Sequence, residues 1–300
     1  MVSSIVVGLL YIFLVFTTLP LHVIILTILL QKSEFRNLTA YRIMMNMSMA
    51  ECVIILGHAA AGIMSICQTT FNSYFDRISG CFVSVGWVGV TLLSLTLSLN
   101  RFLVFVGFKI AAKTEMFCFK LMIVFVWTVT AVLFGVHLIP EASITYDTQI
   151  HAYRYRHTGA RFAVVIEHIE YFGIFVALST VFILSVGTVF AIIVKRNLHS
   201  TRFKLSSPEI KLFIQSLIIF IYLSTIRCLW HFGRSIICSC TAFIALGLAT
   251  QLIGGLNTVL YLLFNRTLRG YFLEVFKLRT NVVKVAITSS EQKHNNRLDL

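Results

Sequence analysis

The stretch ISGCFVSVGWVGVTLLSLTLSLN, residues 78–100, contains no Asp, Glu, Lys or Arg. A helix needs roughly 20 apolar residues to cross a hydrocarbon core of about 30 Å, and this stretch is long enough. Two other long apolar stretches each contain one charged residue, Glu51 in 43–75 and Arg227 in 212–233. Four more contain none: 1–31, 121–140, 171–194 and 235–265. The sequence therefore predicts seven crossings of a membrane.

Composition supports a membrane protein built only of helices. Hydrophobic residues make up 58% of the chain and charged residues 12%, whereas soluble domains carry about 25% charged residues. The apolar stretches are too long for barrel strands and lack their alternation, so an all-α seven-transmembrane helix bundle follows. The expected helices are 5–30, 41–66, 81–106, 119–139, 171–194, 212–233 and 242–264. We expect a bundle domain over 1–280, with a short amphipathic surface helix at 266–279, and a disordered tail over 281–300.

The distribution of basic residues predicts the orientation. The segments 31–42, 107–120 and 195–211, the C-terminal tail and Arg101 together carry 19 Lys and Arg against 6 Asp and Glu. The segments on the other side carry 5 against 5. Because Lys and Arg stay on the cytoplasmic side, we expect the N-terminus outside and the C-terminus inside. The charges Glu167 and Glu170 fall in the expected loop 141–170, where solvent would surround them.

Catalytic and metal-binding signals are missing from the sequence. It contains no Gly-rich phosphate loop and no pattern of a serine, a histidine and an acid. The seven cysteines show no metal-ligand spacing, and no basic soluble module for nucleic acid is present. We therefore expect no enzyme activity, no metal, no cofactor and no nucleic-acid partner. The lipid bilayer is the expected environment.

Short polar motifs follow one another along the predicted helices. They are Asn46-Met47-Ser48-Met49-Ala50-Glu51, Leu99-Asn100-Arg101-Phe102, Asn257-Thr258-Val259-Leu260-Tyr261 and Phe264-Asn265-Arg266. Their order and depth resemble those of the rhodopsin-like superfamily of G-protein-coupled receptors. A closer likeness is to the nematode serpentine chemoreceptors of class T or X. It rests on Tyr41-Arg42-Ile43-Met44, on Ala50-Glu51-Cys52 followed by His58 and Gly62, and on Leu99-Asn100-Arg101.

The resemblance implies a chemosensory receptor that activates a heterotrimeric G protein on its cytoplasmic face. In that family, the positions matching five residues switch the bundle or couple it to the G protein: Glu51, Asn100, Arg101, Asn257 and Tyr261. We expect Glu51 to meet Asn257 or Arg227. Position 251 is glutamine where opsins carry the lysine that binds retinal, so retinal is not expected.

A small, largely apolar or weakly acidic ligand is expected within the bundle, in the half nearer the outside. Its predicted contacts are Val83, Trp87, Val90, Arg227, Trp230 and Gln251. The family's usual disulfide to the 140–170 loop is ruled out, because that segment has no cysteine. Any outer disulfide would use Cys67, Cys81, Cys238 or Cys240, and we expect Cys67 and Cys81 to pair.

One other class of function fits seven helices. A transporter or channel would use Glu51 and Arg227, the charged residues deep in the bundle, along a translocation path. The absence of inverted repeats and of Gly/Pro-broken helix pairs argues against this alternative. We expect the plasma membrane as the location, and the family resemblance adds the ciliary membrane of sensory neurons as a candidate.

Overall fold

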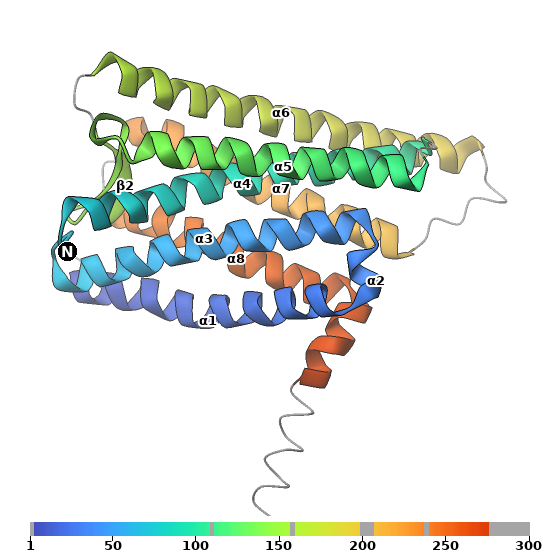
Figure 1. The fold of residues 1–300 in the computed structure, drawn as a ribbon, viewed down its shortest axis with the longest axis horizontal. Coiled ribbons are helices and arrows are strands. Elements are labelled where there is room, and N and C mark those ends of the chain that lie inside the picture. The colour runs from blue at the N-terminus through green and yellow to red at the C-terminus, as the bar shows by residue number, and fades with distance from the viewer. Residues whose placement is uncertain (1–2, 109–110, 157–159, 199–206, 237–239, 276–300) are drawn as a thin grey trace, which may run out of the picture.

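Among the residues that the structure describes, seven long helices lie side by side in an elongated bundle (Figure 1). The computed structural model describes residues 3–108, 111–156, 160–198, 207–236 and 240–275. The helices are α1 (Ser4–Gln31), α3 (Thr39–Cys67), α4 (Ser73–Val106), α5 (Ala112–His137), α6 (Arg161–Leu198), α7 (Ser207–Ile236) and α8 (Cys240–Phe264). Each contains a segment long and apolar enough to cross a membrane. The prediction of a seven-helix membrane bundle is confirmed.

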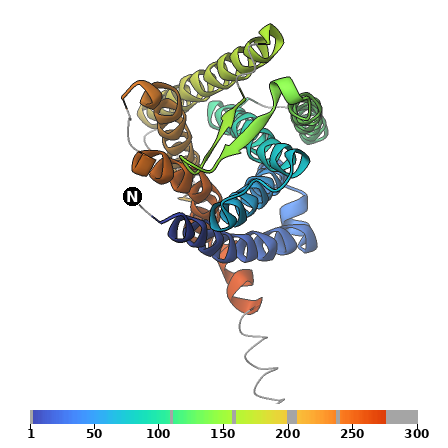
Figure 2. The ribbon, with the colours of Figure 1, turned by 90° about the vertical axis from the view of Figure 1, so that its left-hand side faces the viewer.

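The two ends of the bundle differ. At one end, β1 (Ile144–Asp147) and β2 (Ala152–Tyr155) form an antiparallel hairpin, preceded by the 3-10 turn η1 (Pro140–Ala142). The hairpin lies across the mouth of the bundle (Figure 2). At the other end lie the short helix α2 (Ser33–Arg36) and the helix at 266–275 (Figure 1). We call these the hairpin end and the α2 end.

Close approach between helices centres on α3 and α4. Helix α4 contacts α3, α5, α6, α7 and β1, so it is the central helix of the bundle. A Cβ added to Gly8 of α1 would lie 2.6 Å from the carbonyl oxygen of Gly62 in α3. Small residues at such crossings let helix backbones pack closely in a membrane, where burying apolar surface adds little driving force because lipid chains are themselves apolar.

Helix α4 starts at Ser73, earlier than the predicted residue 81. The side chain of Asn72 caps it by accepting a hydrogen bond from the Phe75 amide at 2.8 Å. The acid in its first turn, Asp76, is buried but accepts the amide hydrogen of Tyr146 in β1 at 2.7 Å. Because the hairpin satisfies this carboxylate, the helix extends through a charged segment.

The segment 141–170 was expected to be a loop, but it contains the hairpin and the first turns of α6. Helix α6 starts at Arg161 instead of 171. Glu170, expected in solvent, is buried and hydrogen-bonded. The surface helix predicted for 266–279 is present at 266–275, whereas 276–279 and the tail over 281–300 lie outside the described residues.

Gly80 of α4 lets the backbone of the hairpin pack directly against the backbone of the helix. A Cβ at this position would lie 2.0 Å from the carbonyl oxygen of Ile144, a backbone atom that cannot rotate away. We expect Gly80→Ala to destabilise the fold by about 1–3 kcal/mol, as overpacking does. Gly135→Ala is the control, because nothing lies within 4 Å of its added Cβ and alanine favours a helix. Thermal unfolding of both purified variants checks this, and equal melting temperatures would contradict it.

Candidate functional site

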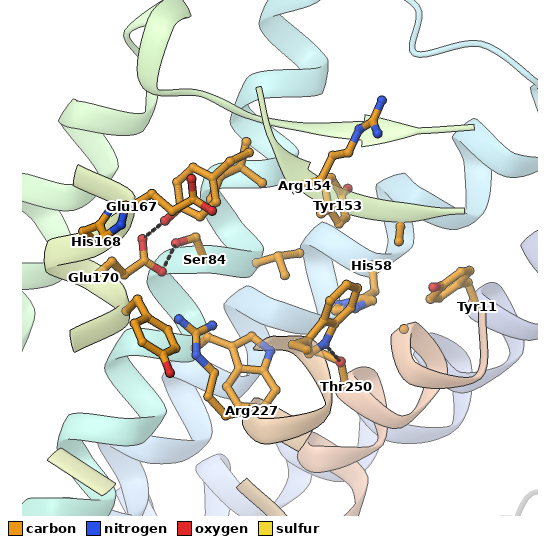
Figure 3. A pocket seen from close by; sticks show the side chains of 18 residues that line it. Tyr11, His58, Ser84, Tyr153, Arg154, Glu167, His168, Glu170, Arg227 and Thr250 are labelled. Atoms are coloured by element: carbon orange, nitrogen blue, oxygen red, sulfur yellow. Dashed lines mark hydrogen bonds between the residues drawn. The ribbon is translucent and has the colours of Figure 1, made fainter. Parts of the chain in front are cut away.

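A cavity of about 280 Å³ lies beneath the hairpin. Six helices and both strands contribute to its wall, and only α5 among the long helices does not. Figure 3 shows Glu167, His168 and Glu170 on one side and His58 and Tyr11 on the other. A cavity of this kind, enclosed by many elements and lined by aromatic residues, is typical of small-molecule sites.

Two tryptophans give the cavity much of its apolar wall. Trp87 of α4 and Trp230 of α7 both line it. The indole N–H of Trp230 donates to Thr250 Oγ1 of α8 at 2.8 Å, which fixes the ring against the neighbouring helix. The Tyr153 hydroxyl of β2 donates to the carbonyl oxygen of Gly57 at 2.8 Å, so the hairpin is tied to α3 as well. The wall is therefore held in place by hydrogen bonds between elements.

Glu170 gathers donors from three other elements. Ser84 Oγ of α4 donates to its Oε1 at 3.0 Å, and His137 Nε2 of α5 lies 3.1 Å from its Oε2. The Tyr155 hydroxyl of β2 also donates to Oε2. Burial and then the charge of Glu170 raise the pKa of Tyr155, so this hydroxyl keeps its proton and remains a donor. We call these four residues the Glu170 cluster, and it joins the hairpin to α4, α5 and α6.

Arg227 of α7 brings a positive charge to the cavity. Its guanidinium carbon lies 5.9 Å from the ring centroid of Tyr171, within the range of cation–π attraction. Its Nε is buried and has no hydrogen-bond partner among the described residues. The other arginine of the lining, Arg154, already pairs with Asp147 at 2.7 Å. Arg227 is therefore placed to meet an acceptor on a ligand.

The predicted ligand contacts divide into two groups. Val83, Trp87, Arg227 and Trp230 line the cavity. Val90 and Gln251 do not: Val90 is fully buried in the core, and Gln251 Nε2 donates to the carbonyl oxygen of Tyr11 at 3.0 Å. Gln251 therefore faces α1 instead of the cavity. Helix spacing alone could not show this rotation of α8.

Glu51 meets Asn257 in the middle of the bundle. The Asn257 amide donates to Glu51 Oε1, and both side chains are fully buried. Arg227, the other expected partner, lines the cavity instead. His22 of α1 was not foreseen: its Nδ1 lies 3.7 Å from Glu51 Oε2, too far for a direct hydrogen bond. These two facing atoms have no other partner among the described residues.

The other predicted switch residues lie between this pair and the α2 end. Arg101 and Asn100 are buried near the end of α4, and Asn100 Nδ2 donates to Glu115 Oε1 of α5 at 3.2 Å. Tyr261 of α8 is fully buried. Below it, Asn265 Nδ2 donates to the Tyr41 hydroxyl at 2.6 Å. A chain of buried polar side chains therefore continues from the bundle core toward the α2 end.

The expected Cys67–Cys81 disulfide is not formed, because both residues are free cysteines. Cys67 is exposed at the end of α3, whereas Cys81 is buried with its Sγ 3.9 Å from the carbonyl oxygen of Phe134 in α5. The Cys238 and Cys240 side chains lie outside the described part of the structure. Within the described residues, no group of three His, Cys, Asp or Glu side chains could hold a metal ion.

Comparisons with known proteins agree with this geometry. The crystal structure of squid rhodopsin is similar, with a TM-score of 0.74 and 13% sequence identity over 92% of this chain and 85% of that one, so the fold is shared. A search of curated proteins gave no match. The family model of the serpentine type 7TM GPCR chemoreceptor Srt matches residues 1–285, which confirms the predicted relation to serpentine chemoreceptors. The chain therefore belongs to the serpentine type 7TM GPCR chemoreceptor Srt family.

Proposed function

We propose that this protein is a chemosensory receptor that binds a small ligand beneath the hairpin and activates a heterotrimeric G protein at the α2 end. The observation that carries the proposal is the cavity, which is enclosed by helices that also carry the buried polar residues below it. Helix α4 contributes Trp87 to the cavity and Arg101 near the α2 end, and α8 contributes Thr250 and Asn257. A ligand that binds one arrangement of these helices more tightly would shift the bundle toward that arrangement, and the positions of the helices at the α2 end would change with it.

The lining indicates the chemistry of the ligand. Trp87 and Trp230 offer apolar surface, and Arg227 offers a cation whose Nε has no hydrogen-bond partner among the residues that the structure describes. The nearby Glu170 carboxylate is already occupied by three donors, so it does not compete for a ligand's donor groups. We propose a small, largely apolar ligand with a weakly acidic or other acceptor group that meets Arg227.

Arg227→Gln tests this anchor. A hydrogen bond to a charged group contributes about 1.5–3 kcal/mol, so we expect agonist potency to fall by roughly tenfold or more. Dose–response curves of second-messenger output measure this in cells with matched surface expression. Arg161→Gln is the control, because Arg161 is exposed at the start of α6 and does not line the cavity. Equal potency of the parent and Arg227→Gln would place the ligand elsewhere.

We also propose that the hairpin end faces outside and the α2 end faces the cytoplasm of a plasma-membrane receptor, with sensory cilia as a candidate location. The proposal rests on the excess of Lys and Arg in the segments at the α2 end. Glycosylation acceptors engineered into the turn between β1 and β2 should be modified in cells, whereas acceptors engineered into 199–206 should remain unmodified. The reverse pattern would contradict the orientation.

A chemical panel separates the receptor from the rival transporter or channel. Cells expressing the chain should give calcium or second-messenger responses to some compounds. Those responses should disappear in cells that lack G proteins. Current or substrate flux that persists without G proteins would replace the receptor proposal with a translocation path through Glu51 and Arg227.

A further inference from the structure

A second cavity lies on the side of the bundle at the α2 end, away from the site beneath the hairpin. This groove of about 360 Å³ is bordered by α1, α2, α3 and α5. Its floor includes Phe35 and Phe119, which are buried, and its rim includes Leu30 and Val124, which are about half exposed. Exposed apolar side chains at this position on a membrane-spanning bundle face lipid chains, so the groove opens toward the bilayer.

Three cations and no acid are among the described residues that line the groove. They are Arg36 of α2, Arg42 of α3 and Lys120 of α5. Arg42 Nε donates to the carbonyl oxygen of Arg36 at 2.5 Å, which brings the Arg42 side chain to the end of α2. Within the described part of the chain, none of the three forms an ion pair with a carboxylate. Their charges are thus available to an outside anion.

The acids of α2 and α5 are turned to other partners. Glu34 of α2 interacts with the Tyr271 hydroxyl, and Glu115 of α5 accepts a hydrogen bond from Asn100 at 3.2 Å. Neither lines the groove. The positive charge at its rim is therefore not neutralised by the acids nearest to it in sequence.

We propose that this groove is a binding site for one anionic phospholipid. An acyl chain would lie along the apolar floor, and the phosphate and its anionic headgroup would meet Arg36, Arg42 and Lys120. Guanidinium groups recognise phosphate through paired hydrogen bonds, and lysine adds a point charge. A zwitterionic phospholipid would leave part of the positive charge uncompensated, so the site should prefer an anionic one.

The groove is connected to the buried polar residues at this end of the bundle. Tyr41 lines it and accepts a hydrogen bond from Asn265 at 2.6 Å, at the start of the helix over 266–275. Asn46 also lines it, and its Oδ1 accepts the indole hydrogen of Trp127 at 2.8 Å. A bound phospholipid would therefore touch side chains that hold α3 to α5 and to the end of α8.

Native mass spectrometry of the purified full chain tests the proposal. The protein in detergent is given equal amounts of phosphatidylserine and phosphatidylcholine, and the bound lipid is identified. We expect the parent to retain phosphatidylserine preferentially. In the variant with Arg36→Gln, Arg42→Gln and Lys120→Gln, the ratio of bound phosphatidylserine to bound phosphatidylcholine should fall by about tenfold or more. The control carries Lys113→Gln, Arg266→Gln and Arg269→Gln, which removes the same charge from exposed positions outside the groove.

A second variant tests the apolar part of the groove without touching its charges. Val124→Trp should fill the groove from its exposed rim and reduce retention of phosphatidylserine, while thermal unfolding shows that the bundle remains folded. Equal loss in the control triple variant would show that the attraction is general surface charge, and it would overturn the proposal. The proposal would also be overturned if the parent protein retained phosphatidylcholine or a sterol to the same extent as phosphatidylserine.

Discussion

Glu51→Gln receptors are expected to signal differently from the parent while folding nearly as well. Glutamine keeps the shape of Glu51 and an oxygen that accepts from Asn257, but it replaces the carboxyl group, which can gain or lose a proton, with an amide that cannot. It also changes the group that faces His22 Nδ1 across 3.7 Å. The coupling free energy between a ligand site and a distant site in a receptor typically changes affinity by about fivefold or more. Basal output or agonist potency should therefore shift by about this factor.

Second-messenger assays and thermal unfolding together measure this prediction. Glu141→Gln is the control, because it makes the same chemical change at an exposed position of the hairpin end. Glu51→Leu is the comparison for stability, since it leaves the buried Asn257 amide without its acceptor at a cost of about 1–3 kcal/mol. If Glu51→Gln signals like the parent at all agonist concentrations, the carboxylate has only a structural role.

Glu170→Ala should cause the largest loss of stability among the variants considered. The substitution leaves Ser84, His137 and Tyr155 without their shared acceptor inside the bundle. Glu170 and a protonated His137 form a buried ion pair at 3.1 Å, and removing one partner of such a pair costs about 3–5 kcal/mol. Because the cluster ties β2 to α4, α5 and α6, the hairpin should also open more often, and agonist potency should fall.

Hydrogen exchange measured by segment distinguishes this effect from general unfolding. Amides of 144–155 should exchange faster in Glu170→Ala than in the parent, while the central part of α4 stays protected. Glu167→Ala is the matched control, since Glu167 lines the same cavity one turn earlier in α6 but lies outside the Glu170 cluster. Equal effects of the two substitutions would show that the cluster does not hold the hairpin.

Sequence reasoning identified the helices because lipid imposes a simple rule on them. A segment that crosses the hydrocarbon core must be apolar over its length, and the charge-free stretches show this directly. The Glu51–Asn257 contact was foreseen from motifs whose order matched a known superfamily. His22 was not foreseen as a neighbour of Glu51, because its place depends on how α1 packs against α8, where His22 Nε2 lies 2.8 Å from the carbonyl oxygen of Gly254.

The hairpin end was predicted less well for a physical reason. Charged residues there suggested a solvated loop, yet Asp76 and Glu170 are buried because distant segments satisfy their carboxylates. Such partners cannot be read from local spacing. The same holds for Cys81, which faces α5, and for Gln251, which faces α1. Trp87, Trp230 and Arg227 line the cavity as predicted, whereas Val90, which was expected beside Trp87 on α4, is buried in the core.

The most direct test of the receptor account uses purified components. The receptor is reconstituted in liposomes with a heterotrimeric G protein, and nucleotide exchange on the G protein is measured with and without an agonist from the chemical panel. We predict that the agonist accelerates exchange, that Arg227→Gln requires a higher agonist concentration, and that Arg101→Ala abolishes the acceleration. Agonist-dependent ion flux through liposomes containing the receptor alone, with no acceleration of exchange, would contradict the account.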